Sequence, residues 1–338
     1  MINPAINEQK LGGSGPKVSR FGLGALALAG ETDAGTAERI LDRYVELGGR
    51  HIDVADVYGQ GRAEQLVGDW LARRAARDDV VVASKIGQAM TTDPEARGLD
   101  PQRVGSAVRA SLARLGTDRL DLLYLHCWDP NTPLDDTLDA VQELVDDGLV
   151  LHVGVSNYLP SQLQRATLLQ QFAGRTRIAA LQAQYSLLTR DIEWELLGVC
   201  QQEGVGLTVW SPLCGGWLAG AFSRDTPPPE GHPRDRSIFA YRYRANSRTW
   251  RILDAVDAVA TRHGATMAQV ALRWLMDKPF VDSILLGPAS VTQLEENLAA
   301  ADLVLSQADH EELEEVSAPA EPDYPHGFAR MLAQQFTL

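Results

Sequence analysis

Short apolar runs alternate with longer runs of helical character from Phe21 to about Ala300. Most of the short runs are continuously apolar, as expected of strands that are covered on both faces. Eight strand–helix units in succession predict βα repeats around a parallel sheet. The expected strands are Phe21–Ala27, His51–Ala55, Val80–Lys85, Asp121–His126, Val150–Ser156, Ile178–Ala183, Gly206–Ser211 and Asp282–Gly287.

Eight parallel strands can close into one barrel or form two doubly wound halves side by side. The chain has 338 residues, and α/β barrels commonly reach that size as one domain with added loops. We therefore expect an α/β fold, a (β/α)8 TIM barrel that spans residues 1–338 as a single domain. The two-half arrangement stays open at this point.

Residues that favour helix ends lie between the predicted strands. Asp100 and Thr132 each precede a proline, so each can place a capping oxygen ahead of a proline suited to the first helical turn. Ser306 with Asp309 resembles a capping box and predicts an extra C-terminal helix outside the eight units. Glycines suited to the left-handed conformation follow five helical runs: Gly48, Gly116, Gly148, Gly204 and Gly264.

Three segments do not fit the repeat. Residues 8–19 predict an N-terminal β-hairpin that plugs one end of the barrel. The stretch from Leu218 to Ser247 contains three consecutive prolines and five arginines, and we expect a long functional loop. The tail after Ala318 carries aromatic residues and could fold over a pocket. Substrate selection should be sought in these segments.

Composition and charge exclude several classes of protein. The apolar share is 45% and the charged share 22%, which is typical of a globular chain. A formal net charge of −14 disfavours nonspecific binding to nucleic acid or anionic lipid. Three cysteines without a Cys-x-x-Cys spacing support neither a disulfide framework nor a zinc site. No signal peptide or membrane-length apolar run is evident, so we expect a cytoplasmic protein with no membrane or nucleic-acid partner.

Ionisable residues end several of the predicted strands. Asp53 and Tyr58 follow the second strand, Lys85 ends the third and His126 the fourth. In a closed βα barrel the active site lies at these carboxyl ends, so the side chains should converge. Each alone has an ordinary explanation, because a strand-end Asp often forms a turn and a strand-end Lys often reaches solvent.

Together the four side chains make an acid–base system. A phenol has a pKa of about 10, and a nearby cation is needed for efficient proton exchange at neutral pH. Lys85 can supply that charge, while Asp53 holds the ammonium in place. His126 can donate a hydrogen bond to a carbonyl oxygen as it becomes an alkoxide. No metal is needed, and the histidines show no pair with metal-ligand spacing.

Five spaced motifs follow one another on successive predicted units: His51-Ile-Asp-Val-Ala-Asp-Val-Tyr-Gly59, Val81-Val-Ala-Ser-Lys-Ile86, Leu122-Leu-Tyr-Leu-His126, Gly154-Val-Ser-Asn157 and Gln182-Ala-Gln-Tyr185. They resemble the motifs of the aldo-keto reductase family, including the members similar to potassium-channel β-subunits. The resemblance covers the chain from about Leu11 to Ala300. The resemblance implies an NAD(P)(H)-dependent oxidoreductase that reduces an aldehyde or ketone, with Asp53, Tyr58, Lys85 and His126 as catalytic residues.

The resemblance also implies a cofactor site. Ser156, Asn157 and Gln182 would bind the nicotinamide carboxamide, and Tyr185 would stack on its ring. The alternatives are an ordinary turn at Ser156-Asn157 and a core aromatic at Tyr185. The other cofactor-binding candidates are Gly24, Ala25, Asp53, Trp210, Ser211, Pro212, Leu213, Gly215, Arg234, Gly287, Ala289, Gln293, Glu296 and Asn297.

Two departures bear on the choice of cofactor. Ala221 and Ala289 stand where many relatives have side chains that meet phosphate. NADP(H) remains the expected cofactor, but these alanines weaken the preference and leave NAD(H) possible. Arg234 and Arg236 of the long loop could compensate.

The substrate pocket is expected around Leu26, Tyr58, Trp128 and Trp217. Trp128 could flank a sugar ring or an aromatic carbonyl, or it could pack beneath the next helix. We expect a small-molecule carbonyl substrate, a keto-sugar or an aromatic aldehyde above all. A homo-oligomer is left open.

Three other interpretations compete. Gly22-Leu-Gly-Ala-Leu-Ala27 matches a Rossmann glycine motif, but that fold leaves Lys85 and His126 without roles. An aldolase would use Lys85 as a Schiff-base lysine. A redox sensor or regulatory subunit with little turnover would keep the same four residues.

Overall fold

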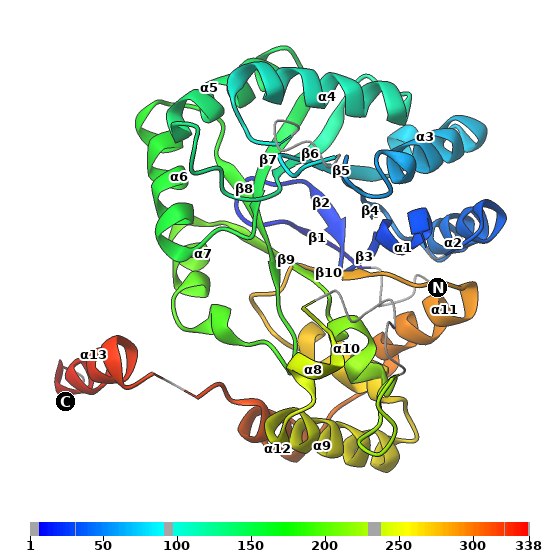
Figure 1. Cartoon of the computed structure of the whole chain (residues 1–338), viewed down its shortest axis with the longest axis vertical. Coiled ribbons are helices and arrows are strands. Elements are labelled where there is room, and N and C mark those ends of the chain that lie inside the picture. Colours follow the sequence, from blue (N-terminus) through cyan, green and yellow to red (C-terminus); the bar gives the residue numbers. More distant parts are fainter. Residues whose placement is uncertain (1–6, 31, 91–96, 229–237, 321, 337–338) are drawn as a thin grey trace.

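The computed structural model describes residues 7–30, 32–90, 97–228, 238–320 and 322–336. Its centre is a closed barrel of parallel strands in the order β10-β3-β4-β5-β6-β7-β8-β9, with helices around the outside (Figure 1). Closure between the first strand of the barrel and the last excludes two separate doubly wound halves. The predicted (β/α)8 architecture is therefore confirmed.

All eight predicted strands are present with small shifts at their ends. The first is shorter than expected, because helix α1 begins at Leu26. The strands are β3 Phe21–Gly24, β4 His51–Asp53, β5 Val81–Ile86, β6 Leu120–Leu125, β7 Val150–Ser156, β8 Ile178–Gln184, β9 Gly206–Trp210 and β10 Ser283–Leu286.

Helices follow the strands and cover the barrel. They are α1 Leu26–Gly30, α2 Ala34–Glu46, α3 Arg62–Arg74, α4 Pro101–Leu115, α5 Leu134–Asp146, α6 Pro160–Phe172, α7 Leu196–Glu203, α8 Tyr241–Arg244, α9 Ser247–His263, α10 Met267–Met276, α11 Val291–Leu298, α12 Gln307–Ser317 and α13 Phe328–Ala333. Within the described part of the chain, none of them combines the length and apolar character needed to cross a bilayer.

Most of the predicted helix ends are confirmed. The Asp100 side chain accepts a hydrogen bond from the Arg103 backbone N–H, and Ser306 with Asp309 forms a capping box. The five predicted glycines all have positive φ.

The prediction for Thr132 is wrong. Helix α5 begins at Leu134 without a side-chain cap. The Thr132 hydroxyl instead donates to Asp129 Oδ2 at 2.7 Å, and this bond to a charged carboxylate holds its oxygen away from the N–H groups of the helix start.

The predicted hairpin closes the amino end of the barrel. It pairs β1 (Glu8–Lys10) with β2 (Lys17–Ser19), and its turn docks on the starts of the last strands. The Gly13 N–H donates to the Gly204 carbonyl at 2.8 Å. Gly12 has φ +59°, and a Cβ there would lie 2.4 Å from the backbone nitrogen of Gly206. Only glycine fits this contact.

Side chains fill the barrel interior, so the barrel is no pore. A buried interior cluster joins the hairpin to the strands: Leu11, Val18, Ala83, Leu122, Tyr124 and Ala180. Tyr124 spans this interior, and its hydroxyl donates to Thr208 Oγ1 at 3.1 Å. A Cβ at Gly154 would lie 2.6 Å from the Tyr124 ring, so glycine makes room for it.

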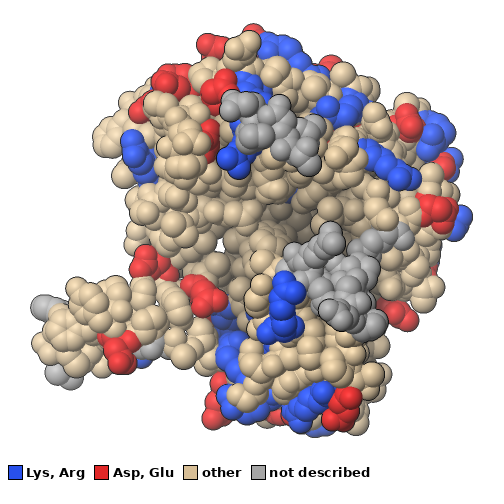
Figure 2. Space-filling model, in the orientation of Figure 1, with Lys and Arg blue, Asp and Glu red and all other residues tan. Residues whose placement is uncertain are grey.

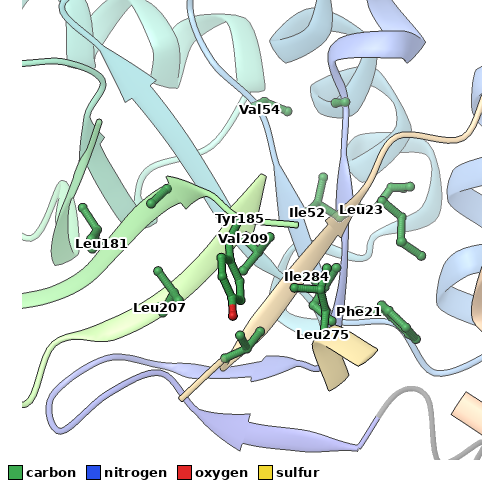
Figure 3. Close-up of a cluster of buried hydrophobic side chains, with 14 of the residues drawn as sticks. Phe21, Leu23, Ile52, Val54, Leu181, Tyr185, Leu207, Val209, Leu275 and Ile284 are labelled. Carbon is green, nitrogen blue, oxygen red and sulfur yellow. The ribbon is translucent and has the colours of Figure 1, made fainter. Parts of the chain in front are cut away.

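A larger apolar core lies between the strands and the helices (Figure 3). On the face shown in Figure 2, basic and acidic side chains are interspersed mainly around the edge, and the middle of the face is hollowed. This face of the acidic protein therefore carries both positive and negative side chains.

The C-terminal tail does not fold over a pocket as expected. Helix α13 projects away from the body of the molecule (Figure 1), and Tyr324 is 78% exposed. His326 anchors the root of the projection, where its ring stacks on Trp194 and its Nε2 lies 3.3 Å from Glu195 Oε1. These contacts hold the tail against the outside of the barrel, near α7.

Candidate active site

Strand alternation directs the predicted catalytic side chains into the carboxyl end of the barrel. Side chains two residues apart on a strand share a face, and Ala83, two residues before Lys85, belongs to the interior cluster. The same relation holds between Tyr124 and His126. Asp53 ends β4, and the turn after it carries Tyr58. The structure thus brings together the four residues expected from the sequence.

The Lys85 ammonium lies at the centre of the group and is fully buried. Its Nζ donates to Asp53 Oδ1, to the Val54 carbonyl at 2.8 Å and to the Tyr58 hydroxyl oxygen at 3.2 Å. An ammonium has three N–H donors, and all three are used. Because the Tyr58 oxygen accepts from Lys85, its own O–H remains able to donate to a ligand.

The electrostatics keep Tyr58 protonated. Burial raises the pKa of Tyr58 above 10, and the positive charge of Lys85 offsets only part of that rise. The lysine therefore moderates the phenol pKa but does not bring it below its ordinary value. For Lys85 itself, burial acts to lower the pKa, but Asp53 and Tyr58 outweigh burial and raise it. At neutral pH the pair is a phenol beside an ammonium.

His126 is neutral. Burial and then the charge of Lys85 lower its pKa to about 3, and its ring meets that of Tyr58 edge-on with centroids 6.0 Å apart. Its backbone N–H donates to the Ile86 carbonyl at 2.9 Å, which fixes the residue to β5. Its Nδ1 is buried and has no hydrogen-bond partner among the described residues. A neutral imidazole has one N–H and can donate it to a bound oxygen.

A series of hydrogen bonds links the Asp53 carboxylate to strands β8 and β7. Gln182 Nε2 donates to Asp53 Oδ2 at 2.8 Å. Ser156 Oγ donates to the Gln182 carbonyl at 3.0 Å and accepts from Asn157 Nδ2 at the same distance. Gln182 and Ser156 are buried, whereas Asn157 is exposed and has φ +59°. Of the four residues in this series of hydrogen bonds, Asn157 is therefore the one that is open to a ligand.

The placement of Tyr185 does not fit the expected stacking role. Tyr185 is fully buried, and its ring packs against Trp274 of α10 and against Phe280. Its hydroxyl donates to Glu193 Oε1 at 2.6 Å. Figure 3 shows it among buried side chains that include Val209 and Leu207. It follows the end of β8 on the face opposite Gln182, so it points toward the helices and is a core aromatic.

Trp210 is the aromatic residue on the site side. It shares a face of β9 with Thr208, which points into the barrel to meet Tyr124. Its Nε1 donates to Asn157 Oδ1 at 3.2 Å, and its ring is partly exposed. From the sequence, Trp210 is expected among the other cofactor-binding candidates, apart from Ser156, Asn157 and Gln182. Strand alternation, counted from Thr208, is the signal that could have placed it beside Asn157.

Two segments of the expected cofactor site follow β9 and β10. Ser290 caps α11 by accepting from the Gln293 backbone N–H, and Gln293 Oε1 accepts from the Ala289 N–H at 2.8 Å. Gln293 therefore shapes its own loop. Ala221 is exposed and supplies no charge. Arg234 and Arg236 lie outside the described residues.

The remaining cofactor candidates lie along the same end of the barrel. Gly287 and Glu296 are exposed, and Asn297 and Gly24 are half-buried. Ala25 is fully buried, and its N–H donates to the backbone carbonyl of Asp53 at 2.9 Å. This bond helps to fix the position of Asp53. After Trp210 the chain turns sharply. Ser211, Leu213 and Gly215 are partly exposed there, Pro212 is buried, and Gly215 has φ +66°.

The expected pocket walls divide into two groups. Leu26 is 61% exposed. Trp128 is half-buried, with its ring edge-on to Tyr158 at 5.4 Å between centroids. Trp217, by contrast, is fully buried, and the prediction that it lines the pocket does not hold. Its ring stacks on Phe222, and its Nε1 donates to the Phe239 carbonyl, so it anchors the segment after β9.

Comparison with known proteins agrees with this geometry. The sequence matches the aldo/keto reductase family over residues 20–318. Norsolorinic acid reductase of Aspergillus flavus is 31% identical over 91% of this chain and 78% of its own length. The uncharacterized oxidoreductase YrpG of Bacillus subtilis is 31% identical over 88% of this chain and 91% of its own length.

A third relative carries a regulatory name. The "Probable voltage-gated potassium channel subunit beta" of Arabidopsis thaliana is 30% identical over 88% of this chain and 91% of its own length. The family match spans most of the chain and includes every element that carries the four converging side chains. The protein therefore belongs to the aldo/keto reductase family and is an oxidoreductase of the kind that uses a nicotinamide cofactor.

Proposed function

We propose that the protein reduces an aldehyde or ketone to the alcohol, with Tyr58 as the proton donor. The observation that carries the proposal is the bond from Lys85 Nζ to the Tyr58 oxygen at 3.2 Å. The lysine occupies one lone pair of the phenol and leaves its proton free for a bound carbonyl. The alternative of a sensor with little turnover is not favoured by the comparisons.

Each of the four residues has a role that follows from its contacts. Tyr58 gives its proton to the oxygen of the carbonyl as that oxygen becomes an alkoxide. Lys85 stabilises the phenolate that remains, and Asp53 holds Lys85 charged and in place. His126, neutral because its pKa is about 3, donates an N–H to the same oxygen. Donors arranged in advance around a developing charge are a large source of catalysis.

The residues at the barrel mouth fit a nicotinamide ring. Such a cofactor supplies a hydride to the carbonyl carbon when it is bound. Asn157 Nδ2 already donates to the His126 carbonyl and to Ser156 Oγ. The exposed Asn157 Oδ1, which accepts from Trp210, is therefore left to accept one further hydrogen bond from a carboxamide. The partly exposed indole of Trp210, held by its bond to Asn157, offers a flat face to the ring. We assign the stacking role to Trp210 in place of Tyr185.

We favour NADP(H) as the cofactor, with NAD(H) as the second choice. Family resemblance supports NADP(H), whereas the uncharged Ala221 and Ala289 remove two contacts that a 2′-phosphate commonly has. A direct comparison of the two cofactors on the same substrate decides between them.

For the substrate we favour a keto-sugar or an aromatic carbonyl. Leu26 is exposed and Trp128 is half-buried, so both apolar side chains are accessible to a ring-shaped substrate beside Tyr58. An indole edge can pack against either a sugar ring or an aromatic ring. Alcohol oxidation is the reverse reaction of the same site.

The test is a paired screen of NADPH and NADH oxidation against aldehydes, keto-sugars and diketones. Tyr58→Phe removes only the donor hydroxyl, and we expect kcat to fall by about 10²- to 10⁴-fold, the usual contribution of a general acid. Tyr324→Phe, in the exposed tail, is the matched control and should reduce at the wild-type rate. Undiminished reduction by Tyr58→Phe would overturn the proposal.

A further inference from the structure

Asp56 is a buried carboxyl group in the turn that carries Tyr58. It lies three residues after Asp53 and is 3% exposed. Its backbone N–H donates to the Lys85 carbonyl at 3.1 Å, and the Tyr58 N–H donates to the Ala55 carbonyl within the same turn. The turn therefore fixes the Asp56 backbone beside Lys85, two residues before Tyr58.

The Asp56 carboxyl accepts a backbone hydrogen bond from Val57, but among the described residues it lacks side-chain partners such as its neighbour Glu64 has. Glu64, on α3, is fully buried and accepts from Ser84 Oγ and Arg114 Nε, each at 2.6 Å. Asp56 Oδ1 is buried and has no hydrogen-bond partner among the described residues. Two carboxyl groups thus share one buried region, and the guanidinium that reaches it is bonded to Glu64.

Charged groups of α3 and α4 act on Asp56. Glu64 of α3 opposes its ionisation, while Arg114 and Arg103 of α4 favour it more weakly. Burial, followed by the charge of Glu64, raises the pKa of Asp56 to about 7. The charge of Asp56 in turn affects two other groups, Tyr58 in the active site and Cys127 after the end of β6. Ionised Asp56 raises the pKa of both.

We propose that Asp56 is a positioning residue for carbonyl reduction, whose carboxyl group exchanges a proton with solvent and thereby controls how readily Tyr58 releases its own. This inference rests on the proposed function. Neutral Asp56 leaves Lys85 as the dominant charge near the phenol, which favours the phenolate. Ionised Asp56 adds a negative charge that opposes the phenolate and slows proton release. Asp56 itself neither touches the substrate nor joins the reaction.

The first test is the pH profile of reduction. Wild-type kcat at saturating substrate and cofactor should fall by roughly three- to tenfold as pH rises through about 7. Asp56→Asn keeps the size and the neutral form, so it should hold the low-pH rate across that range. Asp69→Asn, an exposed change on α3, should retain the wild-type profile. A wild-type decline that persists in Asp56→Asn would overturn the inference.

The second test needs no turnover. The native pKa of Asp56 is raised above its unfolded value of about 3.9, so the native state binds the proton more tightly. The stability from this group is complete below about pH 4 and is lost as pH rises to about 7. Relative to wild type, Asp56→Asn should therefore gain in Tm over that interval. A Tm difference that does not change with pH would refute the titration.

The outcomes separate this inference from the proposed function. If Tyr58→Phe reduces carbonyls normally, the function fails, while the Tm titration still reports on Asp56. If Asp56 does not titrate, the positioning role fails and the function stands. Asp56→Ser serves as a second neutral variant if Asp56→Asn does not fold, and the same loss of the pH dependence of kcat and Tm is expected.

Discussion

The two ends of the barrel each contain an aspartate set among the strands, and the two are bonded differently. Asp282, just before β10, accepts from the backbone N–H groups of Gly12 and Leu207, at 3.3 and 2.9 Å, and from the Gln9 amide at 3.3 Å. Asp53, at the end of β4, is bonded by the ammonium of Lys85 and the amide of Gln182. The first carboxyl group fastens the hairpin to the barrel through neutral donors, and the second holds a buried ammonium.

This contrast explains why the Asp53 end of the barrel can be catalytic while the Asp282 end is structural. The donors to Asp282 are two backbone N–H groups and one amide, none of which carries a charge, so Asp282 supports structure. At the other end, the Lys85 ammonium bonds Tyr58 as well as Asp53, and Gln182 is bonded to Ser156. The position of Asp53 therefore determines the positions of these side chains. The interior cluster around Tyr124 separates the two ends, so a change at one end should leave the other unaffected.

Matched substitutions of the two aspartates should give the largest effects. Asp53→Asn leaves the buried Lys85 ammonium without its carboxylate, and breaking such a pair costs about 3–5 kcal/mol. We expect kcat to fall by at least about 10²-fold, together with a lower Tm. Asp282→Asn keeps one acceptor oxygen and should cost about 1–3 kcal/mol of stability with kcat unchanged. Loss of turnover in both variants would contradict the separation of the two ends.

A second pair of substitutions sharpens the comparison at the hairpin end. Gly12→Ala places a methyl group 2.4 Å from the Gly206 nitrogen at a positive φ, and we expect a loss of about 2–4 kcal/mol. Gly13→Ala meets its nearest atom at 3.4 Å and should cost far less. Denaturant midpoints measure both effects. The folded fraction of Gly12→Ala should still turn over normally, and a specific loss of kcat would show that the ends are coupled.

The smallest effect is expected where two aromatic residues are compared at the catalytic end. Trp210→Ala should weaken binding of the reduced cofactor by roughly tenfold, which is the scale of one aromatic stacking contact. Tyr185→Phe loses only the hydrogen bond to Glu193, so it should keep cofactor affinity and lose about 1 kcal/mol of stability. Cofactor fluorescence titration distinguishes them. Wild-type cofactor affinity in Trp210→Ala would contradict the stacking role of Trp210.

Sequence reasoning succeeded where a pattern determines a direction. Continuous apolar runs located all eight strands, and parallel closure then forced Asp53, Lys85 and His126 to one end. It failed for Tyr185 and Trp217, because an aromatic residue suits a pocket and a core equally well, and residue type alone does not say which way it faces. For Tyr185 the alternation of β8 contained the answer. For Trp217 the deciding contacts come from Phe222 and Phe239 in an irregular segment without a period.

The hairpin also ties the order of folding to the whole length of the chain. Gln9 Nε2 bonds the carbonyl of Asp282, 273 positions away, and β3 pairs with β10 across a similar span. Neither contact can form until the chain has been synthesised past Asp282 and β10. The hairpin is therefore among the last elements to dock, and closure of the barrel waits for β10. A chain cut before Asp282 would lack both partners, so neither the hairpin contact nor the closing strand pair could form.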